Sequence, residues 1–400
     1  MQLLRPAHIA DEAHLSTRVP DLDVLLGQAH FYRSAGSIFS WTSIARIRLA
    51  HRVKMAAPYV AQSAPGVREE LMTTPRASID SHCAVRAGRP ADCSSTTRNV
   101  WRLQSRWAGI ALLWSVMASA QEMEPRSYSA VPIGTNFVVA GYARSTGDVT
   151  LDPSLPITDL QARINAYSLG YSHSFDVAGH VASVAVLQPY ANAYLTGNVA
   201  GVPGQAWRSG LGDVRFRIAA SLVGGPALTP QEFAQRSPTT TLGASLSVVA
   251  PTGQYQPARI INVGSNRWAF KPELGLSQPV GNWFVEGAAG VWVFTDNSDF
   301  FGGKRRSQAP LAVFQWHGGY TWRPGLWIAA DFTYLTGGRT SVNGVQNQDL
   351  QASTRYGVTL SVPLAAQWSA KLAWSSGLST RVGGDFQTVS VALQYRWFDR

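Results

Sequence analysis

The stretch Asn266–Ser277, NRWAFKPELGLS, decides the fold because its apolar residues recur at every second position. Trp268, Phe270, Pro272, Leu274 and Leu276 take one parity, and Arg267, Ala269, Lys271, Glu273, Gly275 and Ser277 take the other. Successive side chains of a strand point to opposite faces, so this segment predicts a strand with one apolar and one charged face. A soluble sandwich would bury the apolar face and a membrane barrel would expose it to lipid. Connector lengths, aromatic positions and targeting must decide between the two.

Similar segments of about ten residues recur along the chain. They predict twelve strands, near 134–144, 163–176, 180–194, 212–222, 239–250, 265–277, 282–294, 310–322, 326–336, 350–362, 367–377 and 388–398. The connectors alternate long with short, as outer-membrane barrels require. Tight turns are expected at 176–179, 278–281, 323–325 and 363–366, and long loops near 145–162, 195–211, 251–264, 295–309, 337–349 and 378–387. The connector 223–238 breaks the alternation, and we expect a short periplasmic helix within it.

Aromatic residues stand near the ends of the predicted strands, where the membrane interfaces would lie: Trp283, Trp316, Trp322, Trp327, Trp368, Trp374, Tyr395 and Trp397. Trp and Tyr favour this level of a bilayer. The alternative is that the 14 tryptophans fill a large soluble core. The chain also ends in Tyr395-Arg396-Trp397-Phe398-Asp399-Arg400, which resembles an aromatic-terminated last barrel strand.

A secretory signal peptide is predicted at 100–120. Arg102 and Arg106 precede an apolar run, Trp107–Ala118, which ends in Ala118-Ser119-Ala120 before Gln121. Secretory signals typically have a positively charged region, then an apolar region, then small residues before the cleavage site. We expect cleavage between Ala120 and Gln121. The alternative is a buried helix. The run is too short to span a membrane as a helix.

Residues 1–99 differ from the rest, because they hold both cysteines, Cys83 and Cys93, and show no sustained period. Signals are normally N-terminal, and Val100 can be encoded by an alternative bacterial start codon. We therefore interpret 1–99 as a disordered extension or a misplaced start of translation, followed by the signal peptide (100–120) and a barrel domain (121–400). The alternative is an N-terminal domain binding metal through His82, Cys83 and Cys93, which lacks the usual ligand spacing.

The basic balance of the whole chain is +10, but it is not concentrated in the barrel. Residues 121–400 hold 20 Lys or Arg and 16 Asp or Glu, which gives 20 − 16 = +4. The one dense run, Lys304-Arg305-Arg306, lies in a predicted loop, where it suits anionic outer-leaflet lipid. Nucleic-acid binding is not predicted, because no basic stripe with interleaved aromatics is present.

If the apolar parity faces lipid, the lumen receives charges of both signs. The predicted lumen and solute pathway comprises Asp213, Arg215, Arg217, Arg267, Lys271, Glu273, Glu286, His317, Asp331, Arg355, Lys371 and Arg396. In a narrow barrel these charges would pair and plug the lumen, and in a wider one they would line a hydrated path. Twelve strands fall between packed and open barrels, so both remain possible. Tyr255, Phe300 and Phe301 are predicted to capture apolar solutes at the mouth.

An enzymatic alternative is an outer-membrane lipid hydrolase using His173 as base on the outer wall. Its neighbours Ser172 and Ser174 point to the opposite face, so no catalytic residue is predicted. An interfacial role for His173 is favoured.

Several blocks carry a resemblance to a known family: Pro251-Thr252-Gly253-Gln254-Tyr255, Ile261–Trp283, Phe294–Gly303 and Gly377–Trp397. They look like the proteins grouped as a "putative meta-pathway of phenol degradation", over about Glu124–Trp397. The resemblance implies an outer-membrane barrel that transports hydrophobic or aromatic compounds. It supplies no catalytic residues.

The sequence thus predicts an all-β fold, an antiparallel transmembrane barrel of about twelve strands in the bacterial outer membrane. Its predicted function is passage of small hydrophobic or aromatic compounds, without cofactor or metal. The expected partners are outer-membrane lipid, such solutes and the barrel assembly machinery. The alternative is a non-conducting structural or adhesive barrel whose external loops bind a partner.

Overall fold

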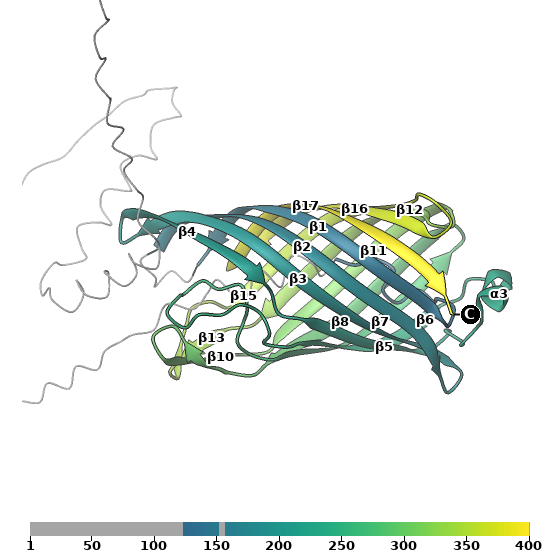
Figure 1. The fold of residues 1–400 in the computed structure, drawn as a ribbon, viewed down its shortest axis with the longest axis horizontal. Helices are drawn as coiled ribbons and strands as arrows, with labels where there is room; N and C mark the ends of the chain where they lie inside the picture. The colour runs from purple at the N-terminus through teal and green to yellow at the C-terminus, as the bar shows by residue number, and fades with distance from the viewer. Residues whose placement is uncertain (1–122, 152–156, 400) are drawn as a thin grey trace, which may run out of the picture. The chain divides into compact units, whose positions relative to one another are not determined.

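Twelve long strands form a closed antiparallel barrel (Figure 1). The computed structural model describes residues 123–151 and 157–399. The barrel strands are β1 (Thr135–Thr150), β2 (Ile157–Val177), β3 (His180–Val199), β5 (Arg215–Val223), β6 (Thr241–Val249), β7 (Ala269–Val280), β8 (Trp283–Phe294), β11 (Leu311–Arg323), β12 (Leu326–Gly337), β15 (Gln351–Pro363), β16 (Trp368–Thr380) and β17 (Gly383–Phe398). Each pairs with the next, and β17 pairs with β1 from Thr135↔Phe398 to Thr150↔Gly383. The predicted twelve-stranded barrel is confirmed.

Several predictions about the N-terminal part lie outside the described residues. These are the extension 1–99, the signal peptide 100–120, and its cleavage residues Ala118, Ala120 and Gln121. The described part of the chain contains no helix long and apolar enough to cross a membrane.

The wall is apolar outside and polar inside. On β5, β7 and β8 the outward residues Ile218, Leu274 and Val285 are 52%, 56% and 57% exposed. The alternate residues Lys271, Glu273 and Glu286 are buried. A soluble sandwich would show the reverse, so the alternation of Asn266–Ser277 belongs to a wall that faces lipid.

The two ends of the barrel differ in their connections. At one end lie the tight turns, the C-terminal residues and α3 (Pro230–Gln235), the short helix expected within 223–238 (Figure 1). Thr229 caps α3, and Glu232 completes a capping box with it. In outer-membrane barrels the short turns face the periplasm, so we assign this end to the periplasmic side.

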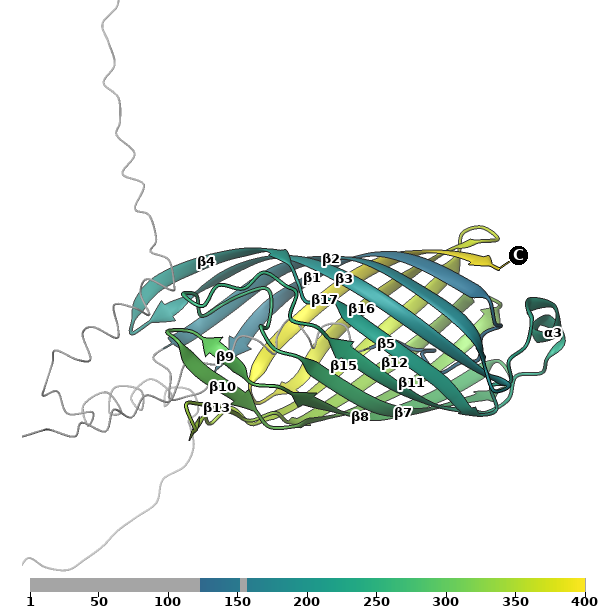
Figure 2. The same cartoon turned by 60° about the horizontal axis from the view of Figure 1, so that its bottom comes forward.

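At the extracellular end the connectors 251–264, 295–309 and 337–349 separate barrel strands as predicted, whereas β1, β2, β16 and β17 continue into 145–162 and 378–387. The connector 378–387 is a hairpin in which β16 ends at Thr380 and β17 begins at Gly383. The connector 195–211 is largely β4 (Val202–Leu211), which pairs with β3. A four-stranded sheet is formed by β9 (Asn297–Phe300), β10 (Lys304–Gln308), β13 (Thr340–Val342) and β14 (Val345–Gln346). These elements lie opposite α3 (Figure 2).

A buried apolar cluster closes part of the extracellular end. It includes Leu160, Ile164, Leu195, Ile261 and Phe386, from the extended strands and the loop between β6 and β7. The inward parity is therefore apolar near the mouth and polar further down. One predicted interface aromatic is wrong: Trp327 is 4% exposed and packs with Phe284 on the inner face.

Candidate functional site: the lumen and its inner segment

Residues Met123–Gly134 cross the periplasmic half of the lumen before β1 begins, and we call them the lumenal segment. Near its start, the Glu124 carboxylate forms an ion pair with Lys371 of β16. Near its end, the Ile133 amide donates to the Leu228 carbonyl at 2.9 Å, in the connector that precedes α3. The segment therefore runs from the β16 wall across the lumen and out to the periplasmic rim.

The ring of Tyr128 lies on a seat made by two glycines that pair across β6 and β7, Gly243 and Gly275. A Cβ atom at Gly275 would come 2.1 Å from ring carbons of Tyr128, and one at Gly243 would come 2.8 Å from the ring. The Tyr128 hydroxyl donates to Glu273 Oε1 at 2.8 Å and lies 2.9 Å from Ser245 Oγ. At these two positions of the wall only glycine leaves room for the Tyr128 ring, so the wall is complementary in shape to the lumenal segment.

Arg126 fastens the segment to the strands that follow β7 around the wall, β8, β11 and β12. Its guanidinium lies 4.5 Å from the centroid of the Phe284 ring and 5.4 Å from that of Trp327. It also donates to Thr321 Oγ1 at 3.1 Å. Cation–π contacts strengthen where water is excluded, and both rings are buried. This explains why Trp327 faces inward.

The structure places the predicted pathway residues in two groups. Those on the strands lie on the inner face: Arg215, Arg217, Lys271, Glu273, Glu286, His317, Asp331, Arg355, Lys371 and Arg396. Asp213 and Arg267 lie in loops that precede β5 and β7 at the extracellular end. Asp213 accepts hydrogen bonds from the amides of Gly253 and Ser265, so it holds the β6–β7 loop. Participation of these residues in solute passage stays a prediction.

The inner acidic groups are engaged by the barrel itself or by the lumenal segment. Lys271 Nζ lies 2.9 Å from Glu273 Oε2. His317 Nδ1 lies 2.7 Å from Asp331 Oδ1, and Thr359 donates to Asp331 Oδ2 at 2.6 Å. Glu286 accepts from Ser277 at 2.7 Å and from Ser129 of the segment at 3.0 Å. Arg355 donates to the Phe386 carbonyl at 3.0 Å.

The two halves of the lumen wall differ in packing. From β7 to β15 the inner side chains are buried, including His317, Asp331 and Arg355. From β16 through β17 and β1 to β2 most inner side chains at mid-height are small and half-buried, with Lys371 as the long exception: Gly141, Ala143, Ala166, Ser168, Ala373 and Ala392. The lumenal segment contacts the packed half through Arg126, Tyr128 and Ser129, and contacts β16 through the Glu124–Lys371 ion pair.

The predicted capture residues at the extracellular end are largely packed. Phe300 is 2% exposed and contacts Val342, and Phe301 is half-buried against the apolar cluster. Tyr255 donates its hydroxyl to the Asp299 carbonyl at 2.8 Å. Burial raises the pKa of Tyr255, although a hydrogen bond from Asn297 opposes this. Capture of solutes by these three residues remains a prediction.

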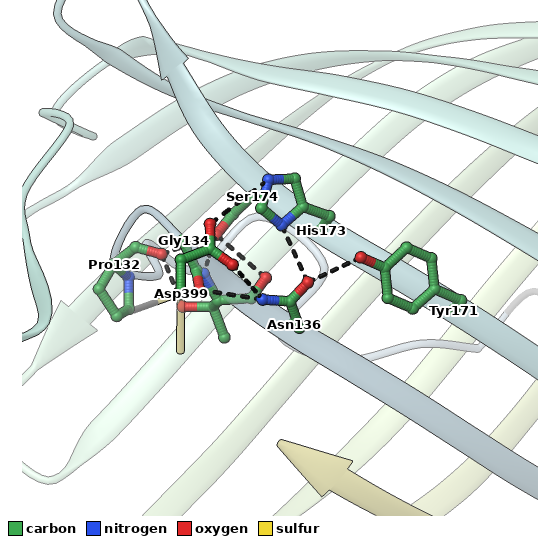
Figure 3. A network of polar contacts seen from close by, with 8 residues as sticks. Pro132, Gly134, Asn136, Tyr171, His173, Ser174 and Asp399 are labelled. Atoms are coloured by element: carbon green, nitrogen blue, oxygen red, sulfur yellow. Dashed lines mark hydrogen bonds and ion pairs between the residues drawn. The ribbon is translucent and has the colours of Figure 1, made fainter. Parts of the chain in front are cut away.

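His173 belongs to a network at the periplasmic seam of the barrel (Figure 3). Its Nδ1 lies 3.1 Å from Asn136 Oδ1, and its Nε2 lies 3.9 Å from Asp399 Oδ2. Asn136 also accepts from Tyr171 at 2.7 Å and donates to Asp399 at 2.7 Å. Among the described residues, no hydroxyl or thiol contacts either ring nitrogen of His173. The network therefore ties together the start of β1, the end of β2 and the residue after β17.

Sequence reasoning missed Glu124, Arg126, Tyr128 and Ser129 as lumenal residues. Their segment has no period of 2 or 3.6, so no pattern marked it. The available signal was the polar stretch between the predicted cleavage site and the first strand.

Comparison with known proteins agrees with this architecture. The model of the family "Putative MetA-pathway of phenol degradation" matches residues 135–396. The COG4313 outer membrane channel from Pseudomonas putida F1 is similar in structure, with a TM-score of 0.60 and 23% identity over 69% of this chain and 100% of that chain. The β domain of the Bordetella autotransporter BrkA matches at a TM-score of 0.43, with 12% identity over 66% of this chain and 100% of that one. The search of curated proteins gives no match. The fold is that of bacterial outer-membrane barrels.

Proposed function

Because the chain belongs to the family "Putative MetA-pathway of phenol degradation", we propose that it is an outer-membrane channel for small hydrophobic or aromatic compounds. Passage would be passive, driven by the gradient of the solute, and would need no cofactor. The observation that carries this proposal is the difference between the two halves of the lumen wall.

The proposed path runs along the small residues of β16, β17, β1 and β2. The side chains at Ala166, Gly141 and Ser168 are small and half-buried, and a solute would pass between them and the lumenal segment. A slot of small, mostly apolar side chains suits a flat ring, because few polar groups lose their hydration when it enters. The packed wall from β7 to β15 offers no such room.

The lumenal segment is the proposed gate of this path. Under the predicted cleavage after Ala120, only Gln121 and Glu122 precede Met123. The segment would then be the free N-terminus of the mature chain, held by non-covalent contacts alone. Its withdrawal would widen the slot without opening the barrel wall.

A second candidate is a barrel that conducts nothing. The glycine seat of Tyr128 favours it, because such a fitted contact also suits a permanent plug. In that case the external strands and loops would carry the function by binding a partner.

A tryptophan scan of one strand separates the two candidates. Ala166 on β2 faces the proposed path, and Leu169 on the same strand is 62% exposed on the lipid face. Single-channel conductance and vesicle uptake of phenol are measured for Ala166→Trp, with Leu169→Trp as the matched control. Channel function predicts that Ala166→Trp reduces both signals and that Leu169→Trp leaves them unchanged. A wild-type barrel that is verified as folded and gives neither signal supports the structural candidate.

A further inference from the structure

Among the buried charged side chains that the structure describes, the atoms that lack a hydrogen-bond partner are almost all arginine nitrogens. Within the described residues, buried nitrogens without a partner are Arg126 Nε, Arg217 Nη2, Arg267 Nη1, and Nε and Nη2 of Arg306. One carboxylate oxygen also lacks a hydrogen bond, Glu273 Oε2, but the Lys271 ammonium lies 2.9 Å from it. Buried polar groups normally have partners, so each of these orphaned donors calls for an acceptor.

Two of these arginines lie at the extracellular mouth. Arg306 of β10 is 2% exposed and Arg267 is 7% exposed. Burial lowers the pKa of Arg306 to about 10, so its guanidinium still carries its charge at neutral pH. Arg267 lies over the Phe294 ring at 4.3 Å, and Arg306 lies 5.8 Å from the Phe300 centroid.

The carboxylates near these two guanidiniums are already engaged. Asp349 accepts from the Thr340 amide and hydroxyl. Asp296 forms its ion pair with Arg305. No carboxylate among residues 123–151 and 157–399 lies within the 4.0 Å ion-pair distance of Arg267 or Arg306. Arg306 thus has no carboxylate at ion-pair distance among these residues, while burial and the nearby Arg306 lower the pKa of Arg267 well below its usual value.

Further basic side chains follow along the barrel axis on the inner face. Arg215 and Arg217 lie on β5 at mid-height, where both are half-buried. Arg217 lies 5.1 Å from the Tyr128 ring centroid, beside the lumenal segment. Arg396 is exposed at the periplasmic end of β17. A solute crossing the barrel would therefore meet positive charge at the mouth, in the middle and at the exit.

We infer that the solutes are small organic anions, with aromatic carboxylates as the class that fits. The inference rests on the proposed channel function and names its cargo. A guanidinium binds a carboxylate through two parallel hydrogen bonds, which an uncharged ring cannot accept. Arg267 and Arg306 bind the carboxylate at the mouth, and Arg215 and Arg217 bind it next at the centre of the lumen. The small residues of the wall from β16 to β2 contact the ring. A narrow low-dielectric lumen strengthens this attraction.

The first test is the reversal potential of the purified full chain in planar bilayers under a gradient of potassium chloride, repeated with potassium benzoate. The variant is Arg217→Gln, and the matched control is Arg163→Gln, an exposed residue on the outer face of β2. We expect anion selectivity, reduced roughly threefold to tenfold in Arg217→Gln and unchanged in Arg163→Gln. Conductance that is cation-selective or non-selective would overturn the inference and leave the channel function standing.

A second measurement does not depend on conductance. Binding of benzoate and of benzyl alcohol, which have the same ring and differ in charge, is compared by tryptophan fluorescence. We expect benzoate to bind at least about tenfold more tightly, as expected for an arginine–carboxylate pair. Equal binding would refute the anion preference. Benzoate binding by a folded barrel without conductance would support the anion site while removing the channel function.

Discussion

The glycine seat of Tyr128 yields a quantitative prediction. In Gly275→Ala the new methyl group would stand 2.1 Å from the Tyr128 ring carbons, so the ring must move away by about 1 Å or more to reach ordinary contact. The hydroxyl then loses its hydrogen bonds to Ser245 and Glu273. A neutral hydrogen bond contributes about 1 kcal/mol and one to a charged group about 1.5–3 kcal/mol, which together give about 2.5–4 kcal/mol. The ratio of docked to undocked segment should fall roughly 50- to 700-fold.

Single-channel recording detects this shift as more frequent or larger open events. The matched control is Gly318→Ala on β11, where an added Cβ meets nothing within 4 Å. Heat-modified mobility on gels verifies that both variants are folded. The reasoning would be refuted by a folded Gly275→Ala barrel with the same open events as the wild type and the control.

Three further predictions concern the lumenal segment, the periplasmic seam and α3. Ser129 Oγ and Ser277 Oγ lie 3.3 Å apart, so the double variant Ser129→Cys/Ser277→Cys in a cysteine-free background should form a disulfide. This disulfide should suppress channel opening, and a reductant should restore the conductance. Conductance that does not change on oxidation would count against a mobile segment. Asn136→Ala should lower the unfolding temperature measured by gel mobility, because the Tyr171 hydroxyl loses its buried acceptor. The loss should cost about 1–3 kcal/mol of stability. An unchanged unfolding temperature would show that the network at the seam does not stabilise the barrel. Hydrogen bonds from Thr229 lower the pKa of Glu232, so the cap of α3 is stabilising above the ordinary glutamate pKa and is lost as pH falls through the lowered value. The protection factors of the α3 amides, which correct for the pH dependence of intrinsic exchange, should therefore be lower at pH 3 than at pH 7. In Glu232→Gln the protection factors should not depend on pH, and a wild-type protection factor that is equal at both pH values would contradict the prediction.

The barrel wall was predictable because its physics is local and periodic. The alternation in Asn266–Ser277 fixed which side chains of β7 face lipid, and the tight turns near Gly281 and Gly325 fixed the pairing of adjacent strands. The helix at 230–235 was predictable from a proline at its start and a Thr229–Glu232 capping box.

The filling of the lumen was not predictable, because its contacts join residues far apart in the sequence. Tyr128 and Gly275 are 147 positions apart, and nothing in the sequence of either marks the other. Trp327 has the composition of an interface residue and lies inward because Arg126 covers its ring. The extracellular ends of β1, β2, β3 and β17 were predicted as connectors because inward positions there become apolar, which ends the alternation.

The position of the lumenal segment also constrains how the barrel can assemble. The segment continues into β1, and β1 forms the last seam with β17, so the twelve strands enclose a part of the chain that precedes all of them. Tyr128 contacts β6 and β7 directly. The contacts of the segment with β6 and β7 can therefore help to hold these strands in place as the wall closes. A chain lacking residues 123–133 would have to close around an empty lumen, with slower and less specific pairing of the final seam.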